Sequence, residues 1–316
     1  MPLVDRYGRP VTSLRVSVTQ RCNLKCIYCH REGELNPRGE MELEEVTRLV
    51  KIASELGMTK VKLTGGEPLV RRDIVELVAE LSSLPGVEEV SMVSNGLLLA
   101  DLAGELAEAG LRRVNVSLDT LDGRRYRWVT GGGDVRKAIH GIEAAVEAGL
   151  SPVKVNMVLL KGVNTSEVWR MLEFTRRMGV ILQLIELVSS TPGSDSFYRR
   201  YHFSLDGIEE ELRRRAKAVV VRSMHSRRKY LLKDGGEVEV VKPMHNSLFC
   251  MSCSRLRLTS DGRLKPCLMR GDNLVDILSL MRSGASDREL RRAFVEAVRL
   301  REPYFKEVKP CPKLVW

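Results

Sequence analysis

The first 190 residues alternate short apolar runs with longer segments whose apolar residues recur every three or four positions. The short runs predict strands, and the periodic segments predict helices that bury one face. Strands are expected at residues 14–19, 60–64, 90–94, 113–119, 153–160 and 182–188. Helices are expected at residues 42–56, 74–81, 101–109 and 135–146, and after the capping-box sequence at residues 164–167. Such β-then-α units predict a parallel sheet with right-handed crossovers, either an open doubly wound sheet or a partial barrel.

Polar residues gather where the expected strands end. Both architectures bind ligands at the carboxyl ends of their parallel strands. The residues concerned are the cysteine loop after the first strand, Gly66-Glu67, Ser94-Asn95, Ser117-Leu118-Asp119, Asn156 and Glu186. One mouth of the sheet is therefore expected to collect the chemistry.

The regular alternation stops after Ser189, and a domain boundary is expected near residue 190. The resulting domains are residues 1–190 and 191–316. In the second, a basic helix is expected at 205–216, strands at 219–221, 229–232 and 238–241, and a charged helix at 287–301.

Composition narrows the class of protein. The chain has 316 residues, 43% of them hydrophobic, enough to bury a large core. No apolar run reaches the ~18 residues of a membrane span and the start lacks an apolar signal segment, so a cytoplasmic protein is expected. Fifty-one Lys and Arg against 41 Asp and Glu give a net charge of +10, which favours a polyanion without choosing one. Seven cysteines without a secretory signal favour metal ligation over disulfides.

Three of the cysteines, Cys22, Cys26 and Cys29, follow the first strand at C-x3-C-x2-C spacing. A cubane iron–sulfur cluster normally has four thiolate ligands, so three neighbouring thiols would leave one iron open. Catalytic metal sites keep an open position of this kind for a ligand. Structural thiols or part of a zinc site are the alternatives, although zinc usually recruits Cys or His in pairs.

A second trio, Cys250, Cys253 and Cys267, has C-x2-C-x13-C spacing. The turn Ser260-Asp261-Gly262 lies between its last two members and predicts a hairpin that folds Cys267 back toward Cys253. A second cluster is expected here. A zinc site completed by Cys311 or His245 is the alternative.

Arg255 and Arg257 alternate on the strand that begins at Cys253, so both point to one face. A solvated charged face is the ordinary interpretation of such a pair. Beside a cluster with an open position, the planar guanidinium instead suits capture of a phosphate or a purine edge.

Over nearly its whole length the sequence resembles the molybdenum cofactor biosynthesis protein A family, the GTP 3',8-cyclases of the radical S-adenosylmethionine (SAM) superfamily. The first cysteine motif alone resembles only the superfamily, and the second, with its Arg-x-Arg, narrows the resemblance to the family. Besides the cysteines, the stretches that carry it are residues 5–9, 14–19, 62–69, 94–98, 116–119, 154–156, 185–186 and 253–259.

The resemblance implies a partial (β/α)6 TIM-type radical SAM barrel with a C-terminal α+β layer that closes the mouth. It implies two [4Fe-4S] clusters, the N-terminal one with SAM and the C-terminal one with GTP. The positions that match SAM contacts are Tyr28, Gly66, Ser117 and Val188. Those that match GTP contacts are Arg15, Lys62, Val93, Lys154, Arg255, Leu256 and Arg257, of which Arg255 and Arg257 are expected to be catalytic. Val93, Val188 and Leu256 offer only backbone contacts. Arg15, Lys62 and Lys154 come from strands one, two and five, and converging cations suit a triphosphate.

The implied reaction is the first step of molybdenum cofactor biosynthesis. A 5'-deoxyadenosyl radical from SAM removes the 3' hydrogen of GTP, C3' attacks C8, and one-electron reduction gives (8S)-3',8-cyclo-7,8-dihydroguanosine 5'-triphosphate. The implied partners are GTP, an electron donor such as ferredoxin or flavodoxin, and cyclic pyranopterin monophosphate synthase, which takes the product. A homodimer is left open, and no nucleic acid or membrane partner is expected.

Three features depart from the family's pattern. Members commonly end in Gly-Gly, whereas this chain ends in Leu314-Val315-Trp316. Gln183 stands where the family would have a GTP-contacting arginine, and Gln20 replaces an aspartate before the first cysteine. Cys311 matches no role in the family, so a free thiol is expected.

Two rival functions fit parts of the sequence. A radical SAM enzyme that modifies peptides or proteins would also have an auxiliary cluster, but its C-terminal domain usually carries more cysteines and lacks the Arg-x-Arg hairpin. A nucleic-acid-binding protein with a zinc knuckle would use aromatic platforms, and only 5% of these residues are aromatic.

Overall fold

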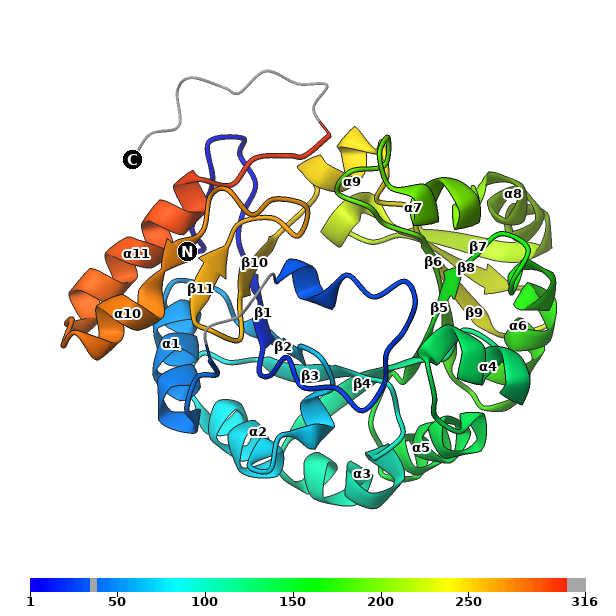
Figure 1. The fold of residues 1–316 in the computed structure, drawn as a ribbon, viewed down its shortest axis with the longest axis horizontal. Coiled ribbons are helices and arrows are strands. Elements are labelled where there is room, and N and C mark those ends of the chain that lie inside the picture. The colour runs from blue at the N-terminus through cyan, green and yellow to red at the C-terminus, as the bar shows by residue number, and fades with distance from the viewer. Residues whose placement is uncertain (35–38, 306–316) are drawn as a thin grey trace.

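The computed structural model describes residues 1–34 and 39–305, so Cys311 and the terminal residues 312–316 lie outside the described residues. Six consecutive parallel strands form the centre of the fold, each paired with the next in the chain. They are β1 (Ser13–Ser17), β2 (Lys60–Thr64), β3 (Glu89–Ser94), β4 (Leu111–Ser117), β5 (Lys154–Leu159) and β6 (Ile181–Glu186). The sheet curves around a central space with helices on its outside (Figure 1). The partial barrel predicted from the sequence is confirmed.

The outer helices form because one face of each is apolar. They are α1 (Leu43–Glu55), α2 (Ile74–Ser83), α3 (Leu99–Glu108), α5 (Val135–Glu147) and α6 (Val168–Arg177). In α2, the four residues that predicted the helix, Ile74, Leu77, Val78 and Leu81, are all buried. A further short helix, α4 (Gly123–Thr130), is absent from the predicted elements, because its three arginines hide the period of Tyr126 and Val129.

The predicted capping box at residues 164–167 is wrong. Asn164 does not cap the helix with its side chain, and a 3-10 turn, η3 (Thr165–Glu167), precedes α6. The Asn164 amide instead accepts a hydrogen bond from the Leu160 N–H (2.8 Å) and donates to the carbonyls of Asp119 (2.9 Å) and Val158 (2.8 Å). Asn164 therefore ties together the ends of β4 and β5, next to the mouth of the barrel.

The C-terminal segment extends the sheet at both edges. β10 (Arg255–Leu258) pairs in parallel with β1, and β9 (Glu237–Val241) pairs in parallel with β6. Antiparallel strands continue outward from these two: β11 (Arg263–Lys265), β12 (Val275–Asp276), β8 (Arg228–Leu232) and β7 (Ala216–Val221). One sheet of 12 strands thus runs across the expected boundary at residue 190.

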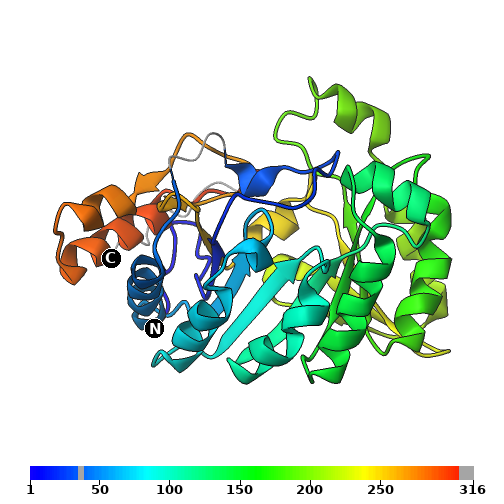
Figure 2. The same cartoon turned by 60° about the horizontal axis from the view of Figure 1, so that its bottom comes forward.

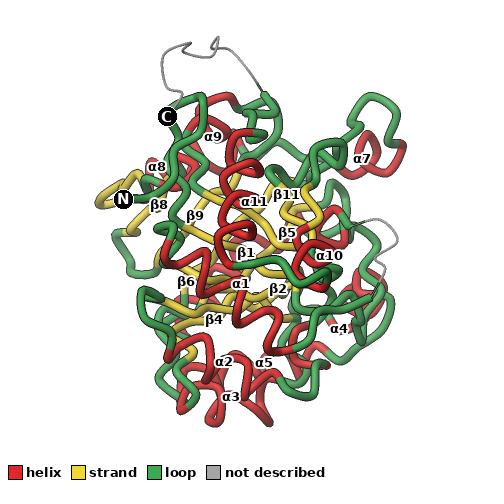
Figure 3. The backbone as a smooth tube through the Cα atoms, turned by 90° about the vertical axis from the view of Figure 1, so that its left-hand side faces the viewer, coloured by secondary structure: helices red, strands yellow, loops and turns green. Residues whose placement is uncertain are grey.

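The remaining helices belong to the C-terminal half: α7 (Ser196–Tyr201), α8 (Asp206–Arg215), α9 (Ser247–Met251), α10 (Ile277–Arg282) and α11 (Asp287–Arg299). α11 lies beside α1 at one edge of the molecule (Figure 3). Phe294 of α11 and Leu256 of β10 belong to the same buried core as Leu14 of β1, so both halves share one core. Within the described ranges, no helix has the length and apolar character that crossing a bilayer requires.

Candidate active site

A cavity of about 510 Å³ occupies the inside of the barrel, lined from the first residues of strands, such as Ser13 and Lys60, to the loops at their carboxyl ends. Both cysteine trios line it, although more than 200 residues separate them in the chain. The other expected site residues that line it are Arg15, Tyr28, Lys62, Gly66, Val93, Ser117, Lys154, Val188, Arg255 and Arg257. Leu256 does not line it, because its side chain is fully buried in the core. The fold therefore brings almost the whole expected set to one space.

The first cysteine trio lies on the loop between β1 and the short 3-10 turn η1 (Arg31–Gly33), and its thiols are free. The Leu24 N–H donates to the Cys22 sulfur and the Arg31 N–H donates to the Cys29 sulfur, each at 3.4 Å. Burial raises the pKa of Cys26 to about 12, and the charges of Asp119 and the other two cysteines act in the same direction.

This donor set fits an iron–sulfur cluster. Metal coordination deprotonates thiols, and the cationic irons offset the repulsion among three thiolates. Each thiolate of a cubane binds its own iron, so the three sulfurs need not converge on one point. Among residues 1–34 and 39–305, no three His, Cys, Asp or Glu side chains are arranged to hold a single metal ion.

The glycines after β2 let its loop approach the cysteine loop closely. The Gly66 N–H donates to the Thr19 carbonyl (2.7 Å), and the Glu67 N–H donates to the Arg21 carbonyl (2.9 Å). A Cβ at Gly66 would lie only 2.2 Å from the Arg21 carbonyl oxygen, so a side chain there would displace the cysteine loop. Glycine at this position is a packing requirement.

Glu67 fastens the same loop to the next strand. Its buried carboxylate accepts hydrogen bonds from the Ser94 hydroxyl (2.8 Å), the Asn95 N–H (2.6 Å) and the Leu69 N–H (3.1 Å). Burial raises the pKa of Glu67 to about 7, although these donors favour its charged form. The Asn95 amide in turn donates to Asn23 in the cysteine loop (2.6 Å). Three strand ends are thereby connected around the first trio.

Tyr28, between the second and third cysteines, is oriented by Asp119 at the end of β4. Its hydroxyl donates to one Asp119 oxygen (2.6 Å), and the other oxygen accepts from the Val158 N–H (2.8 Å). Burial raises the pKa of Asp119 to about 6. The aspartate therefore fixes the tyrosine ring at the cavity wall.

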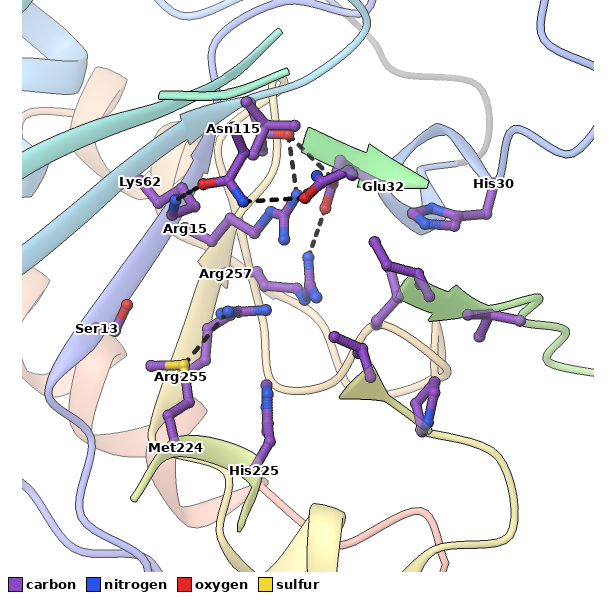
Figure 4. A pocket seen from close by; sticks show the side chains of 18 of the residues that line it. Ser13, Arg15, His30, Glu32, Lys62, Asn115, Met224, His225, Arg255 and Arg257 are labelled. Atoms are coloured by element: carbon purple, nitrogen blue, oxygen red, sulfur yellow. Dashed lines mark hydrogen bonds and ion pairs between the residues drawn. The ribbon is translucent and has the colours of Figure 1, made fainter. Parts of the chain in front are cut away.

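Glu32 is a central member of the site that was not predicted from the sequence. Its carboxylate forms ion pairs with Arg15 (2.8 Å) and Arg257, and accepts a hydrogen bond from the Thr64 hydroxyl (3.0 Å). Figure 4 shows Arg15 and Arg257 directed toward it from two adjacent strands. Burial opposes ionisation, but the two arginine charges outweigh it and lower the pKa of Glu32 to about 2. The only sequence signal was a carboxylate just after the cysteine motif.

Arg255 lies in the same cavity without a carboxylate partner among the described residues. Its guanidinium contacts the Met224 sulfur at 3.4 Å (Figure 4). Burial and the charges of Arg15 and Arg257 lower the pKa of Arg255. Nearby, the His225 ring stacks on Phe249 at 3.9 Å with an interplanar angle of 11°. Burial and Arg255 lower the pKa of His225 well below its ordinary value, so its imidazole is neutral.

A ladder of amides crosses the cavity from β2 to the C-terminal half. The Lys62 ammonium donates to Asn115 (3.1 Å), and the Asn115 amide donates to Asn156 (3.0 Å). Gln183 donates to the same Asn156 oxygen (2.8 Å), and Arg227 donates to the Gln183 oxygen (3.1 Å). Burial and the charges of Arg113, Arg15 and Arg255 lower the pKa of Lys62 well below its ordinary value. The three amides between Lys62 and Arg227 hydrogen-bond to one another along this part of the wall.

A second group of cations surrounds Glu239 of β9. Its fully buried carboxylate pairs with Lys154, with Arg222 (2.6 Å) and with Arg227 (3.6 Å). Burial lowers the pKa of Lys154 to about 8, against the raising effect of Glu239. Three cations share one carboxylate, so this group carries surplus positive charge beside the cavity.

The second cysteine trio lies near these residues, because the His225 N–H, between Arg222 and Arg227 in the chain, donates to the Ser252 carbonyl (2.8 Å) beside Cys253. Burial would raise the pKa of Cys253, but the Arg301 and Arg255 charges outweigh it and the pKa is lowered. The Arg301 guanidinium, 1% exposed, also donates to the Cys253 carbonyl. His245, the alternative zinc ligand, does not line the cavity, and its ring lies 4.9 Å from that of Phe305.

Comparisons with known proteins agree with this site. Residues 16–175 match the model of the radical SAM superfamily, and residues 180–307 match the Molybdenum Cofactor Synthesis C model. A Methanothermobacter thermautotrophicus protein named probable GTP 3',8-cyclase is 49% identical over 306 residues, with 96% of this chain and 99% of that protein covered. A Pyrococcus abyssi protein of the same name is 50% identical over 307 residues, with the same coverage.

Solved structures with a similar fold are more distant in sequence. Streptococcus suis SuiB bound to the precursor peptide SuiA has a TM-score of 0.65 and 14% identity. The match covers 93% of this chain and 66% of SuiB, so the chain spans just under two thirds of that protein. The structure of anSMEcpe with bound AdoMet has a TM-score of 0.59 and 18% identity, and the match covers 84% of this chain and 77% of that one. These likenesses show the fold alone.

Proposed function

The chain belongs to the radical SAM superfamily and, within it, to the GTP 3',8-cyclase family, and from this premise we propose how its cavity serves the cyclisation of GTP that begins molybdenum cofactor biosynthesis. One observation carries the proposal. Two cysteine trios and two groups of cations, drawn from both halves of the chain, line one cavity of about 510 Å³. Such a space suits a dense polyanion held between two metal centres.

We assign the first [4Fe-4S] cluster to Cys22, Cys26 and Cys29. With SAM bound, this centre would supply the one electron that cleaves the cofactor to methionine and a 5'-deoxyadenosyl radical. Tyr28, Gly66, Ser117 and Val188 are the proposed SAM contacts, and all four line the cavity. Interactions in the structure fix the positions of two of them. Asp119 orients Tyr28, and the close approach of Gly66 to the Arg21 carbonyl sets the position of the cysteine loop.

We assign a second cluster to Cys250, Cys253 and Cys267, with an open iron for the purine of GTP. The position of the three thiols supports this assignment, because all of them line the cavity together with Arg255, and the thiolate is the form that binds metal. The neighbouring Arg301 and Arg255 charges favour that anionic form.

We propose that the cations bind the triphosphate and stabilise the negative charge that develops on the nucleotide. The proposed contacts are Arg15, Lys62, Val93, Lys154, Arg255, Leu256 and Arg257, with Val93 and Leu256 limited to their backbones. Arg255 and Arg257 have the catalytic role, because guanidiniums fixed in the cavity wall stabilise developing negative charge. Arg222 and Arg227, which share Glu239 with Lys154, extend the set.

Glu32 acts as a positioning residue in this proposal. It neutralises part of the charge on Arg15 and Arg257 and holds their guanidiniums in fixed directions. Holding groups in place before the substrate arrives reduces the entropic cost of binding.

The remaining partners are also proposals. A one-electron donor such as ferredoxin or flavodoxin would reduce the first cluster, and cyclic pyranopterin monophosphate synthase would take the product. We retain residues 1–190 as the barrel unit and 191–316 as the unit that supplies the second trio. The peptide-modifying alternative is not favoured, because relatives named as cyclases match at about half identity over nearly full length.

The test is an anaerobic incubation of reconstituted protein with SAM, dithionite and GTP. The proposal predicts 5'-deoxyadenosine together with a cyclised guanine nucleotide. Formation of 5'-deoxyadenosine while GTP is recovered unchanged would mean that another substrate occupies the cavity.

A further inference from the structure

Trp128 of α4 is half exposed, at 51%, and is the one exposed aromatic side chain in residues 1–34 and 39–305. Its ring meets that of Tyr201 of α7 edge to face, with centroids 6.4 Å apart. Phe197, one turn earlier on α7, lies 4.7 Å from Tyr201. Two helices distant in the sequence thus present three adjacent rings, which we name the aromatic patch.

The aromatic patch is joined directly to the loop of the first cysteine trio. The Ile27 N–H donates to the Val129 carbonyl (2.9 Å), and the Lys25 N–H donates to the Thr130 carbonyl (2.8 Å). A Cβ at Gly131 would lie 2.6 Å from the Lys25 carbonyl oxygen, so α4 and the loop are in close contact. In Figure 2 the blue cysteine loop and the yellow-green α7 lie on the same upper side of the molecule.

The surroundings of the patch are basic. Exposed cations on α4, on α7 and on the adjoining loops are Lys25, Arg124, Arg127, Lys161, Arg199 and Arg200. In the described part of the chain none of these six forms an ion pair with a carboxylate. Asp122 and Asp195 cap the two helices by accepting from the N–H groups of Arg125 and Tyr198. These two capping carboxylates do not cancel the six exposed cations, so the net charge around Trp128 is positive.

We propose that the aromatic patch and its basic surroundings are the docking surface of an acidic one-electron carrier protein. This rests on the proposed function, since the carrier would deliver its electron to the cluster held by the adjoining loop. The carrier is oxidised by one electron and the cluster is reduced by one, with no other reactant. Complementary charge steers such an encounter, and a partly exposed tryptophan beside cations is typical of an interface hot spot.

The test uses the reconstituted holoenzyme and a purified acidic flavodoxin as the probe. Binding is measured by calorimetry at low and at physiological salt for the wild type, Trp128→Ala and the double variant Arg124→Glu/Arg127→Glu. The matched control is Arg288→Glu/Arg292→Glu, which makes the same charge change on two exposed arginines of α11, at the opposite edge of the molecule (Figure 1). Cleavage of SAM is measured separately with dithionite and with reduced flavodoxin.

The proposal predicts that both patch variants bind flavodoxin about tenfold or more weakly, with a reduced salt dependence for the arginine variant. The control variant binds as the wild type does, and all variants cleave SAM normally with dithionite. Equal losses in the α11 control would show a non-specific charge effect and overturn the proposal. Unchanged flavodoxin binding, or a change in self-association instead, would also overturn it. If the wild type did not cleave SAM with dithionite, the result would count against the proposed function and not against the docking surface.

Discussion

The Arg227 guanidinium donates a hydrogen bond of 3.1 Å to the side-chain oxygen of Gln183. Gln183 departs from the family's pattern, because the resemblance implies an arginine at this position. Although β6 has a glutamine at this position, a guanidinium still reaches it. That guanidinium belongs to Arg227, the residue just before β8. Arg227 also leaves its Nε without a hydrogen-bond partner in the buried wall, as a group prepared for a ligand would.

Replacement of Arg227 by alanine should weaken GTP binding about tenfold to a hundredfold, from the ~1.5–3 kcal/mol of a hydrogen bond to a charged group. Guanosine, which lacks the triphosphate, should bind unchanged. Arg227→Lys should recover part of the loss, because it keeps the charge without the planar fork. Calorimetry with both ligands makes the comparison. Arg228→Ala is the control, since Arg228 pairs with Glu209 away from the cavity. Equal losses for GTP and guanosine would contradict a triphosphate contact.

Replacement of Glu32 by glutamine should lower the free energy of unfolding by about 3 kcal/mol near pH 7, from the linkage of its pKa shift to stability. The Arg15 and Arg257 charges depress the folded-state pKa from 4.5 to about 2, so the stabilisation is complete above pH 4.5 and is lost as the pH falls toward 2. The difference between wild type and variant should therefore narrow below pH 4.5. Anaerobic urea denaturation between pH 7 and pH 3.5 measures it, with the exposed Glu44→Gln as control. A difference that does not change with pH would contradict the ion-pair account.

Replacement of Gly66 by alanine should displace the cysteine loop, because the new Cβ would lie 2.2 Å from the Arg21 carbonyl oxygen. We expect lower iron and sulfide content after reconstitution and loss of SAM binding. The control is Gly104→Ala in α3, where no atom lies within 4 Å and alanine should stabilise the helix by about 0.5–1 kcal/mol. Normal iron content and SAM binding in Gly66→Ala would show that the loop adapts.

Serine at all three positions of the second trio should remove one cluster and leave the other. Iron and sulfide should fall from about eight to about four of each per chain, while dithionite-driven cleavage of SAM persists and GTP cyclisation is lost. Serine at Cys22, Cys26 or Cys29 should abolish the cleavage itself. Zinc in place of iron and sulfide at the second trio, or cleavage retained in all three N-terminal variants, would overturn the two-cluster assignment.

The sequence predicted the barrel well because its signals are local. Alternating apolar runs and helical periods, as in α2, report burial on one face, and the turn at Gly262 (φ +72°) forms the hairpin of β10 and β11 as expected. The short helices α4, α7, α9 and α10 were missed because five to eight residues carry too little periodicity. The pairing of β9 and β10 with opposite edges of the barrel depends on contacts between distant segments.

Some site residues could not be predicted from the sequence for the same reason, namely that their roles depend on contacts between distant segments. Cysteine spacing and Arg-x-Arg are motifs within a few residues, so they could be identified in the chain. Glu32, Glu239 and His225 act through partners that lie far away in the sequence, such as Arg257 for Glu32. A buried carboxylate between arginines has no local signature. Only the folded sheet, which places β1 beside β10, brings these charges together.

The most direct test of the central claim follows the hydrogen at C3' of GTP, because a 3',8-cyclisation must remove it. Reconstituted protein is incubated anaerobically with SAM, dithionite and GTP deuterated at C3', and both products are analysed by mass spectrometry. The account predicts deuterium in 5'-deoxyadenosine and a cyclised nucleotide that has lost it. Unlabelled 5'-deoxyadenosine beside intact deuterated GTP would contradict it.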